Sequence, residues 1–230
     1  MSIEIMLNIK LPTNLLLIPT VALLAACGGG GDTTIDPPSL SNSERAILLN
    51  DIFIDIEEEF IGDNIGPEDF TERADLPVEG LVQYSGAAYV AAGVYGPDDT
   101  EFVVSAYVGE LELDAFFADG NISGEAKNFI VVQNAEEFVE IDAVPIAGGD
   151  VTGTLVIASI QDFDPLLAIY DVTVTGELIA DDGSEFSLNE LDAGLAVLGA
   201  DADALVVFGD TDATVDGVDG YIEFGGLAKQ

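Results

Sequence analysis

The chain has 230 residues, of which 44 are acidic and only five are basic, and its formal net charge is −39. This charge excludes a nucleic-acid partner, because too few cations are available to neutralise phosphates. The absence of histidine excludes Cys/His zinc sites and Ser-His-Asp triads, and with them most familiar enzyme designs. Since 49% of the residues are apolar, the composition predicts a folded protein rather than a disordered acidic tail.

Residues 1–26 have the features of a signal peptide. Their apolar core, residues 13–26, is too short for a stable membrane-spanning helix and ends in small residues. It leads into Leu24-Ala25-Ala26-Cys27, which resembles the lipobox of bacterial lipoproteins and contains the only cysteine of the chain. The resemblance implies that residues 1–26 are removed and that Cys27 becomes the lipidated first residue. Because Gly28 rather than Asp follows the cysteine, it also implies the outer membrane, with the periplasmic and cell-surface faces both open.

Residues 27–40 predict a flexible tether behind the lipidated cysteine, and residues 41–75 predict a helix with a connector. Ser41 and Glu44 fit a capping box, in which each side chain accepts a hydrogen bond from a free backbone N–H of the first turn. An apolar stripe at helical spacing follows, formed by Leu49, Ile52, Phe53, Ile56 and Phe60. We expect this helix to pack on the domain rather than to contact a partner.

Residues 76–230 change to an alternation of period two, which predicts strands with one buried face. Leu111 and Leu113, for example, alternate with Glu112. We expect strands at residues 79–92, 101–108, 109–117, 121–132, 136–144, 151–159, 170–178, 204–209 and 218–224. Eight or nine short strands predict a mainly β fold, either an up-and-down barrel or a sandwich. Acidic outer faces argue against a barrel embedded in lipid, where outward positions must be apolar.

Glycine and aromatic residues recur along residues 76–230 at spacings that form an ordered set of motifs. The set comprises Leu76-Pro77, Gly80, Tyr84-Ser85-Gly86-Ala87, the hairpin 109–124, the strand 153–157 and the closing strand 218–226. It resembles the β-barrel domain of transferrin-binding protein B. The resemblance implies a single eight-stranded antiparallel soluble β-barrel of a bacterial surface lipoprotein, preceded by one short helix. It does not imply transferrin binding, because the chain has one barrel instead of two lobes and lacks residues that match the transferrin-contacting loops.

We expect a binding protein without enzymatic activity or cofactor. Its partner would be a macromolecule or a nutrient carrier, held by the loops at residues 96–100, 148–150 and 181–184, because loops vary in shape without loss of stability. The alternative is a barrel that binds a small ligand or a metal ion in its mouth. An interior filled by Phe, Leu and Val would favour the first interpretation. A cavity lined by convergent polar groups would favour the second.

Residues 212–223 match a calcium-binding EF-hand loop at several positions. Asp212, Asp216 and Glu223 occupy positions 1, 5 and 12, and Thr214 replaces the usual Asp or Asn at position 3. Strand patterns rather than helices flank this segment, and Glu223 also belongs to the alternating run 218–224. An acidic hairpin is therefore the default interpretation, and a calcium site at these four residues is the alternative.

The lipobox generates a direct prediction. Replacing Cys27 with serine should leave an unprocessed precursor without a diacylglycerol group, because the thiolate sulfur is the atom that carries the lipid. Mass spectrometry of the membrane fraction from cells that express either form checks this. A wild-type protein that starts at another residue and carries no lipid would contradict the assignment.

Overall fold

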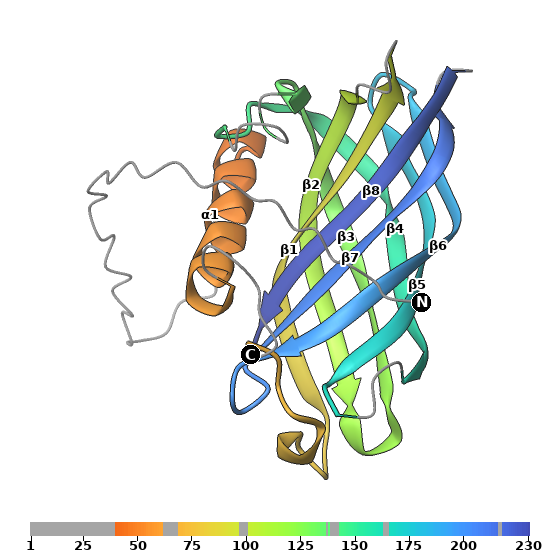
Figure 1. Ribbon diagram of the computed structural model, residues 1–230. Coiled ribbons are helices and arrows are strands. Elements are labelled where there is room, and N and C mark those ends of the chain that lie inside the picture. The colour runs from red at the N-terminus through yellow and green to blue at the C-terminus, as the bar shows by residue number, and fades with distance from the viewer. Residues whose placement is uncertain are drawn as a thin grey trace, which may run out of the picture.

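The computed structural model describes residues 40–61, 69–96, 101–136, 138, 143–162, 166–215 and 218–230. They form a closed antiparallel barrel with one long helix, α1 (Asn42–Phe60), against its outside (Figure 1). Each strand pairs with the next along the chain, and β8 closes the barrel on β1. The strands are β1 (Val82–Tyr95), β2 (Glu101–Phe116), β3 (Asn121–Val132), β4 (Ala147–Asp162), β5 (Ile169–Ala180), β6 (Glu185–Leu198), β7 (Ala204–Val215) and β8 (Val218–Lys229). The predicted eight-stranded barrel preceded by a helix is confirmed.

One cluster of apolar side chains from all eight strands fills the interior of the barrel. Its largest fully buried members are Tyr170, Phe129, Phe224, Leu111, Leu113, Ile122, Leu155, Ile157, Leu178 and Leu191. The predicted alternation is confirmed in β2, in the residue that follows it and in β5, because this cluster contains Leu111, Leu113, Ala115, Phe117, Tyr170, Val172, Val174 and Leu178. Because successive side chains of a strand point to opposite faces, the acids between these positions lie on the outside.

The predicted strand positions were wrong in several places. Residues 136–144 are not a strand where they are described, since Glu136 and Phe138 are helical. The predicted strands 101–108 and 109–117 are a single strand, β2, and residues 148–150 belong to β4 instead of forming a loop. The alternation does not predict β6, because a bulge between Leu188 and Leu191 interrupts it. The nine strands expected from the alternation therefore exceed the eight of the structure by one, whereas the eight strands that the resemblance implies are confirmed.

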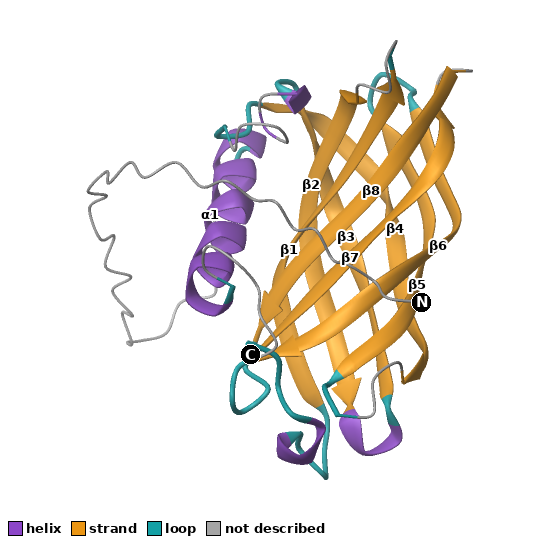
Figure 2. Ribbon diagram, viewed as in Figure 1, coloured by secondary structure: helices purple, strands orange, loops and turns teal. Residues whose placement is uncertain are grey.

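Helix α1 lies along the outside of the barrel and follows its sequence signals closely (Figure 2). Its N-terminus has the predicted capping box of Ser41 and Glu44. Leu49 and Ile56 are buried against the barrel, as predicted, and small residues of β1, Ala87 and Ala91, face the helix in the same apolar cluster as Leu49. No helix among the described residues has both the length and the apolar character needed to cross a membrane.

Polar contacts at both ends of α1 fix its position on the barrel. At the N-terminal end, Arg45 donates to the carbonyl oxygen of Asn128 at 2.6 Å and lies 3.6 Å from a carboxylate oxygen of Asp150. At the C-terminal end, Lys229 of β8 forms an ion pair with Glu59 at 3.1 Å. Asn128 adopts a left-handed backbone conformation, with φ of 54°, at a bulge of β3. Two of the few bases in the chain therefore join the helix to the barrel.

A strap formed by residues 69–81 lies across one end of the barrel, and the end of β7 and the start of β8 lie at the other (Figure 1). Phe70 forms a β-bridge with Leu198 and Glu72 forms one with Leu167, so the strap contacts both the β6 end and the start of β5. Leu76 is buried in the interior cluster, and the guanidinium of Arg73 lies 5.3 Å from the ring centroid of Tyr170. The strap thus covers the interior core at this end.

The packed interior predicts a sharp contrast between two neighbouring residues of β4. Leu155→Ala should lower the free energy of unfolding by about 2–5 kcal/mol, because it opens a cavity in the core. Val156→Ala should change it by less than about 0.5 kcal/mol, since Val156 points outward and is 49% exposed whereas Leu155 is 0% exposed. Urea unfolding of both variants measures the difference. Equal, small losses would contradict a packed interior.

Candidate functional site

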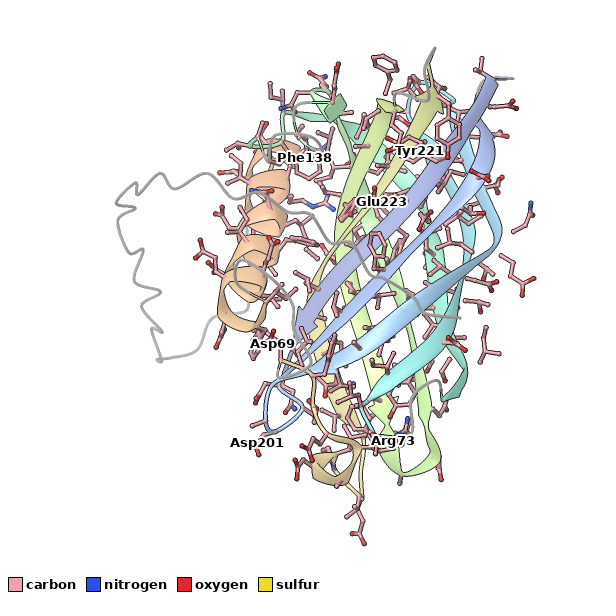
Figure 3. The ribbon with its side chains drawn as sticks, in the orientation of Figure 1. Asp69, Arg73, Phe138, Asp201, Tyr221 and Glu223 are labelled. Atoms are coloured by element: carbon pink, nitrogen blue, oxygen red, sulfur yellow. The ribbon has the colours of Figure 1, made fainter. Side chains whose placement is uncertain are left out.

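Three tyrosines and three carboxylates gather on the outer face of β1, β7 and β8. We name this set the tyrosine–carboxylate face; it comprises Tyr89, Tyr95, Asp210, Asp212, Tyr221 and Glu223. The strand register brings them together, because Asp210 pairs with Glu223 and Asp212 pairs with Tyr221. On the other side of β8, Glu223 pairs with Ala91 and Tyr221 with Gly93. Figure 3 shows Tyr221 and Glu223 in the half of the barrel away from the strap.

Two glycines give the tyrosine rings room to lie against the sheet. The ring of Tyr221 lies over Gly93, and the ring of Tyr89 lies over Gly225, so a methyl group at either glycine would overlap the ring. An aromatic ring that covers a glycine on the neighbouring strand is a recognised way of stabilising a β-sheet. The rings are therefore held in place by the backbone of the adjacent strand.

Hydrogen bonds and ring contacts order the face further. The Tyr89 hydroxyl donates to a carboxylate oxygen of Glu223, and the Tyr95 hydroxyl donates to Asp212 at 2.9 Å. The rings of Tyr95 and Tyr221 have centroids 5.8 Å apart. Phe53 of α1 meets Tyr89 edge-on with centroids 5.8 Å apart, so the helix borders the face on one side. Aromatic rings and carboxylates are thus arranged before any partner arrives.

The electrostatics of the face favour a positively charged partner. Burial raises the pKa of Glu223, and the nearby charges of Asp210 and Glu101 raise it further, while the hydrogen bond from Tyr89 opposes them. Burial also raises the pKa of Tyr89 well above its usual range, and the Glu223 carboxylate adds to this effect. The hydrogen bond to Asp212 is the main reason that the pKa of Tyr95 is raised. The shifts of Glu223 and Tyr89 reflect negative charge in a partly desolvated place, whereas the shift of Tyr95 arises at an exposed hydrogen bond.

All four bases that follow Cys27 are engaged elsewhere. Arg45 and Lys229 hold α1, as described above, and Lys127 bridges Glu112 and Glu125 at 2.7 and 2.6 Å. Arg73 lies over the ring of Tyr170 at the strap. The tyrosine–carboxylate face therefore has no basic side chain of its own to neutralise it within the described part of the chain.

The residues of the predicted calcium loop are only partly placed. Asp212 and Glu223 lie on β7 and β8, two register positions apart, and each accepts a hydrogen bond from a tyrosine. The backbone of Thr214 continues β7, whereas Asp216 lies outside the described residues, as does Cys27. No group of three or more potential metal ligands comes together among the residues that the structure describes. The calcium site stays a prediction.

Of the three loops predicted to bind a partner, one is a described turn. Residues 181–184 join β5 to β6, with a hydrogen bond from the Ala180 N–H to the Ser184 carbonyl at 2.9 Å and with Gly183 at a φ of 85°. Residues 148–150 start β4 and contact α1 through Asn42 and Arg45, and residues 97–100 lie outside the described part.

The sequence reasoning missed the tyrosine–carboxylate face. The alternation of outward Asp210, Asp212, Tyr221 and Glu223 was the signal that could have indicated it.

A second acidic feature lies at the strap end of the barrel. It is an open pocket of about 370 Å³ between the C-terminal end of α1, the strap and the β6–β7 turn. Its lining includes the acids Glu59, Asp69, Glu72 and Asp75 and the apolar residues Phe60, Phe70 and Leu167. Figure 3 shows Asp69 at this end, together with Arg73 and Asp201. The pocket lies at the opposite end of the barrel from the last residues of β7 and the first residues of β8.

Comparison with known proteins gives a distant structural likeness only. No protein-family model and no curated protein matches the sequence. Among solved structures, a single-residue mutant of transferrin-binding protein B from Haemophilus parasuis Hp5 is similar at a TM-score of 0.41 and 14% identity, over 70% of this chain and 28% of that chain. A double mutant of that protein gives 0.39 and 16%, over 70% and 27%. Intact Ap-TbpB, with N and C lobes, gives 0.36 and 16%, over 70% and 28%. The chain spans less than a third of the length of these proteins.

The raised pKa of Glu223 predicts how its replacement changes the pH dependence of stability. The folded state binds this proton more tightly than the unfolded chain, so Glu223 costs stability as the pH rises above its ordinary value of 4.5. Glu223→Gln keeps an acceptor for Tyr89 and removes the charge. The free energy of unfolding at pH 7 should therefore rise, by an amount on the order of 1 kcal/mol.

Denaturant unfolding between pH 4.5 and pH 7 measures this effect, with Glu79→Gln as the matched control on an exposed acid of the strap. The control should follow the wild-type pH dependence to within about 0.5 kcal/mol. If both variants show the same profile, the carboxylate of Glu223 is not the group responsible.

Proposed function

We propose that this chain is a lipid-anchored outer-membrane protein whose barrel binds a protein partner with a basic surface and catalyses no reaction. Residues 1–26 act as the signal peptide, and residues 27–40 tether the barrel to the lipid on Cys27. The single observation that carries the binding role is the tyrosine–carboxylate face, in which ordered aromatic rings alternate with carboxylates that no base among the described residues neutralises.

The packed interior supports a macromolecular partner over a small ligand held inside the barrel. Closed barrels of this size can hold one small molecule when their interior leaves space. Here the interior positions carry large apolar side chains from every strand, including Leu111, Leu155, Tyr170 and Phe224. Binding is therefore assigned to the outer surface and the turns, where the fold tolerates variation.

The chemistry of the face defines the class of partner. Carboxylates form charge-assisted hydrogen bonds with lysine and arginine, and tyrosine rings attract the same cations through their faces. Tyrosine is also enriched among the residues that dominate the binding energy of protein interfaces. With a net charge of −39, the chain attracts a basic partner at long range, and the association rate should fall as salt rises.

The tyrosines provide the test. Tyr95→Ala/Tyr221→Ala should weaken capture of the partner by about tenfold or more, which corresponds to about 1.4 kcal/mol, because it removes two rings from the centre of the face. The partner is first identified by cross-linking on intact cells, and its affinity for each purified variant is then measured.

Phe116→Ala is the matched control, since Phe116 is an aromatic residue with 41% exposure on the outside of β2. Circular dichroism establishes that each variant is folded. A partner that binds the double variant and the control with equal affinity would contradict the proposal that the tyrosine–carboxylate face binds it.

A further inference from the structure

The ladder between β6 and β7 stops partway along both strands. Its pairs run from Leu198 with Ala204 to Gly194 with Phe208, which makes five, whereas β7 and β8 are joined by twelve. Beyond this point both strands continue in extended conformation. Among the described strands, the ladder pairs of residues 185–193 of β6 are with β5 alone, with none at Asn189 and Glu190, where the bulge lies, and the ladder pairs of residues 209–215 of β7 are with β8 alone. Gly209 still lies against Ala193 and the carbonyl group of Asp192, so the two edges are in contact at this first position. We name these two facing edges the seam.

Repulsion between carboxylates on β6 and β7 explains why the pairing of these two strands ends after Gly194 and Phe208. If the register of β6 and β7 continued, Asp192 would lie opposite Asp210, and Glu190 would lie opposite Asp212. All four side chains are exposed on the outer surface. Like charges directly opposite each other on neighbouring strands are destabilising, and the four bases of the described chain are engaged at other places. Repulsion therefore opposes closure of the seam.

The seam presents backbone groups that a further strand can use. In an antiparallel sheet, alternate residues direct their N–H and C=O groups to one neighbour and the remaining residues direct theirs to the other. Roughly half of the backbone groups in residues 185–193 and 209–215 thus face the seam, and none of the described turns or loops supplies them with a backbone partner. Such edges are templates for an added strand.

We propose that the seam is the docking site for an extended basic segment of a partner protein, which adds as a strand between β6 and β7. Backbone hydrogen bonds to both edges hold the segment, and lysines or arginines at every second position meet Asp192, Asp210 and Asp212. The remaining positions face the interior side, where Thr211 and Ala213 are partly exposed and accept small apolar side chains.

Charge complementarity selects this occupant. A second copy of the chain, also at −39, would bring further carboxylates to the seam and is repelled. The seam adjoins the tyrosine–carboxylate face, since Asp210 and Asp212 belong to both. The inference rests on the proposed function and deepens it by naming the way in which the basic partner binds.

Hydrogen exchange and a designed peptide test the inference on the chain that begins at residue 27. The probe is a peptide of about ten residues, long enough for one strand, in which lysine and valine alternate. One control replaces every lysine by glutamate, and a second keeps the lysines but carries a methyl group on every second backbone nitrogen, which removes hydrogen-bond donors. The lysine–valine peptide should bind at least about tenfold more tightly than either control, and more weakly as salt rises.

In the free protein, the amides of residues 185–193 and 209–215 that face the seam should exchange quickly, and the bound peptide should slow them at least about tenfold. Seam amides that are already protected in the free protein would overturn the proposal. So would equal binding of the N-methylated peptide, because binding would then rest on charge alone. Protection that grows with protein concentration and accompanies a dimer would assign the seam to a second copy instead.

A charge-reversal pair separates the seam from the overall charge. Glu190→Lys/Asp192→Lys places opposite charges across the seam and should close it, so that the seam amides are protected without peptide and peptide binding is lost. Glu79→Lys/Asp119→Lys changes the net charge equally at exposed positions away from the seam and should bind the peptide. Equal loss of binding in both variants would overturn the proposal.

Should the variant with both lysines not fold, Glu190→Gln/Asp192→Asn removes the repulsion alone and should give partial protection of the same amides.

The readouts also distinguish a failure of this inference from a failure of the proposed function. Peptide binding that fails while Tyr95 and Tyr221 still determine capture of the natural partner would refute the seam and leave the tyrosine–carboxylate face intact.

Discussion

The packing of apolar side chains inside the closed barrel is the constraint on which the rest of the structure depends. Every strand contributes inward residues to one cluster, and the strap adds Leu76 at one end. Because successive residues of a strand alternate between the two faces, an interior that takes the Leu, Val, Phe and Tyr leaves the acids on the outside. The same alternation that builds the core therefore produces a strongly negative outer surface, and this is the surface on which we propose that the partner binds.

The positions of the few basic side chains show which of the carboxylates on the outside of the barrel are paired with a positive charge. Arg45 and Lys229 are used at the two ends of α1, and Lys127 joins the acids of β2 and β3. The only base among the described residues of β6, β7 and β8 is Lys229, at the end of β8, and it pairs with Glu59 of α1. On these strands Asp212 and Glu223 each accept a hydrogen bond from a tyrosine hydroxyl. Asp192 and Asp210 lie where the pairing of β6 with β7 has stopped. Local electrostatics thus shape both the tyrosine–carboxylate face and the seam.

Features that depend on neighbouring residues could be predicted from the sequence, and features that depend on distant pairing could not. The capping box at Ser41 and the alternation around Leu111 are local, and both were confirmed. β6 was not predicted, because the bulge before Leu191 displaces its apolar positions by one residue. Tyr89 and Glu223 meet only because β8 closes on β1, which the spacing of either strand alone does not show. Cys27 and the calcium loop stay predictions.

Titration of the chain from residue 27 onward with apolar ligands, from benzene to a long-chain fatty acid, tests the central claim most directly. A ligand that binds the folded state raises the melting temperature, and the stabilisation grows with the logarithm of the ligand concentration divided by its dissociation constant. Since large side chains such as Tyr170 and Phe224 fill the interior, we expect no saturable binding and no rise in melting temperature. A ligand that binds with one-to-one stoichiometry and raises the melting temperature by several degrees would show a usable cavity inside the barrel, and would contradict the placement of function on its outer surface.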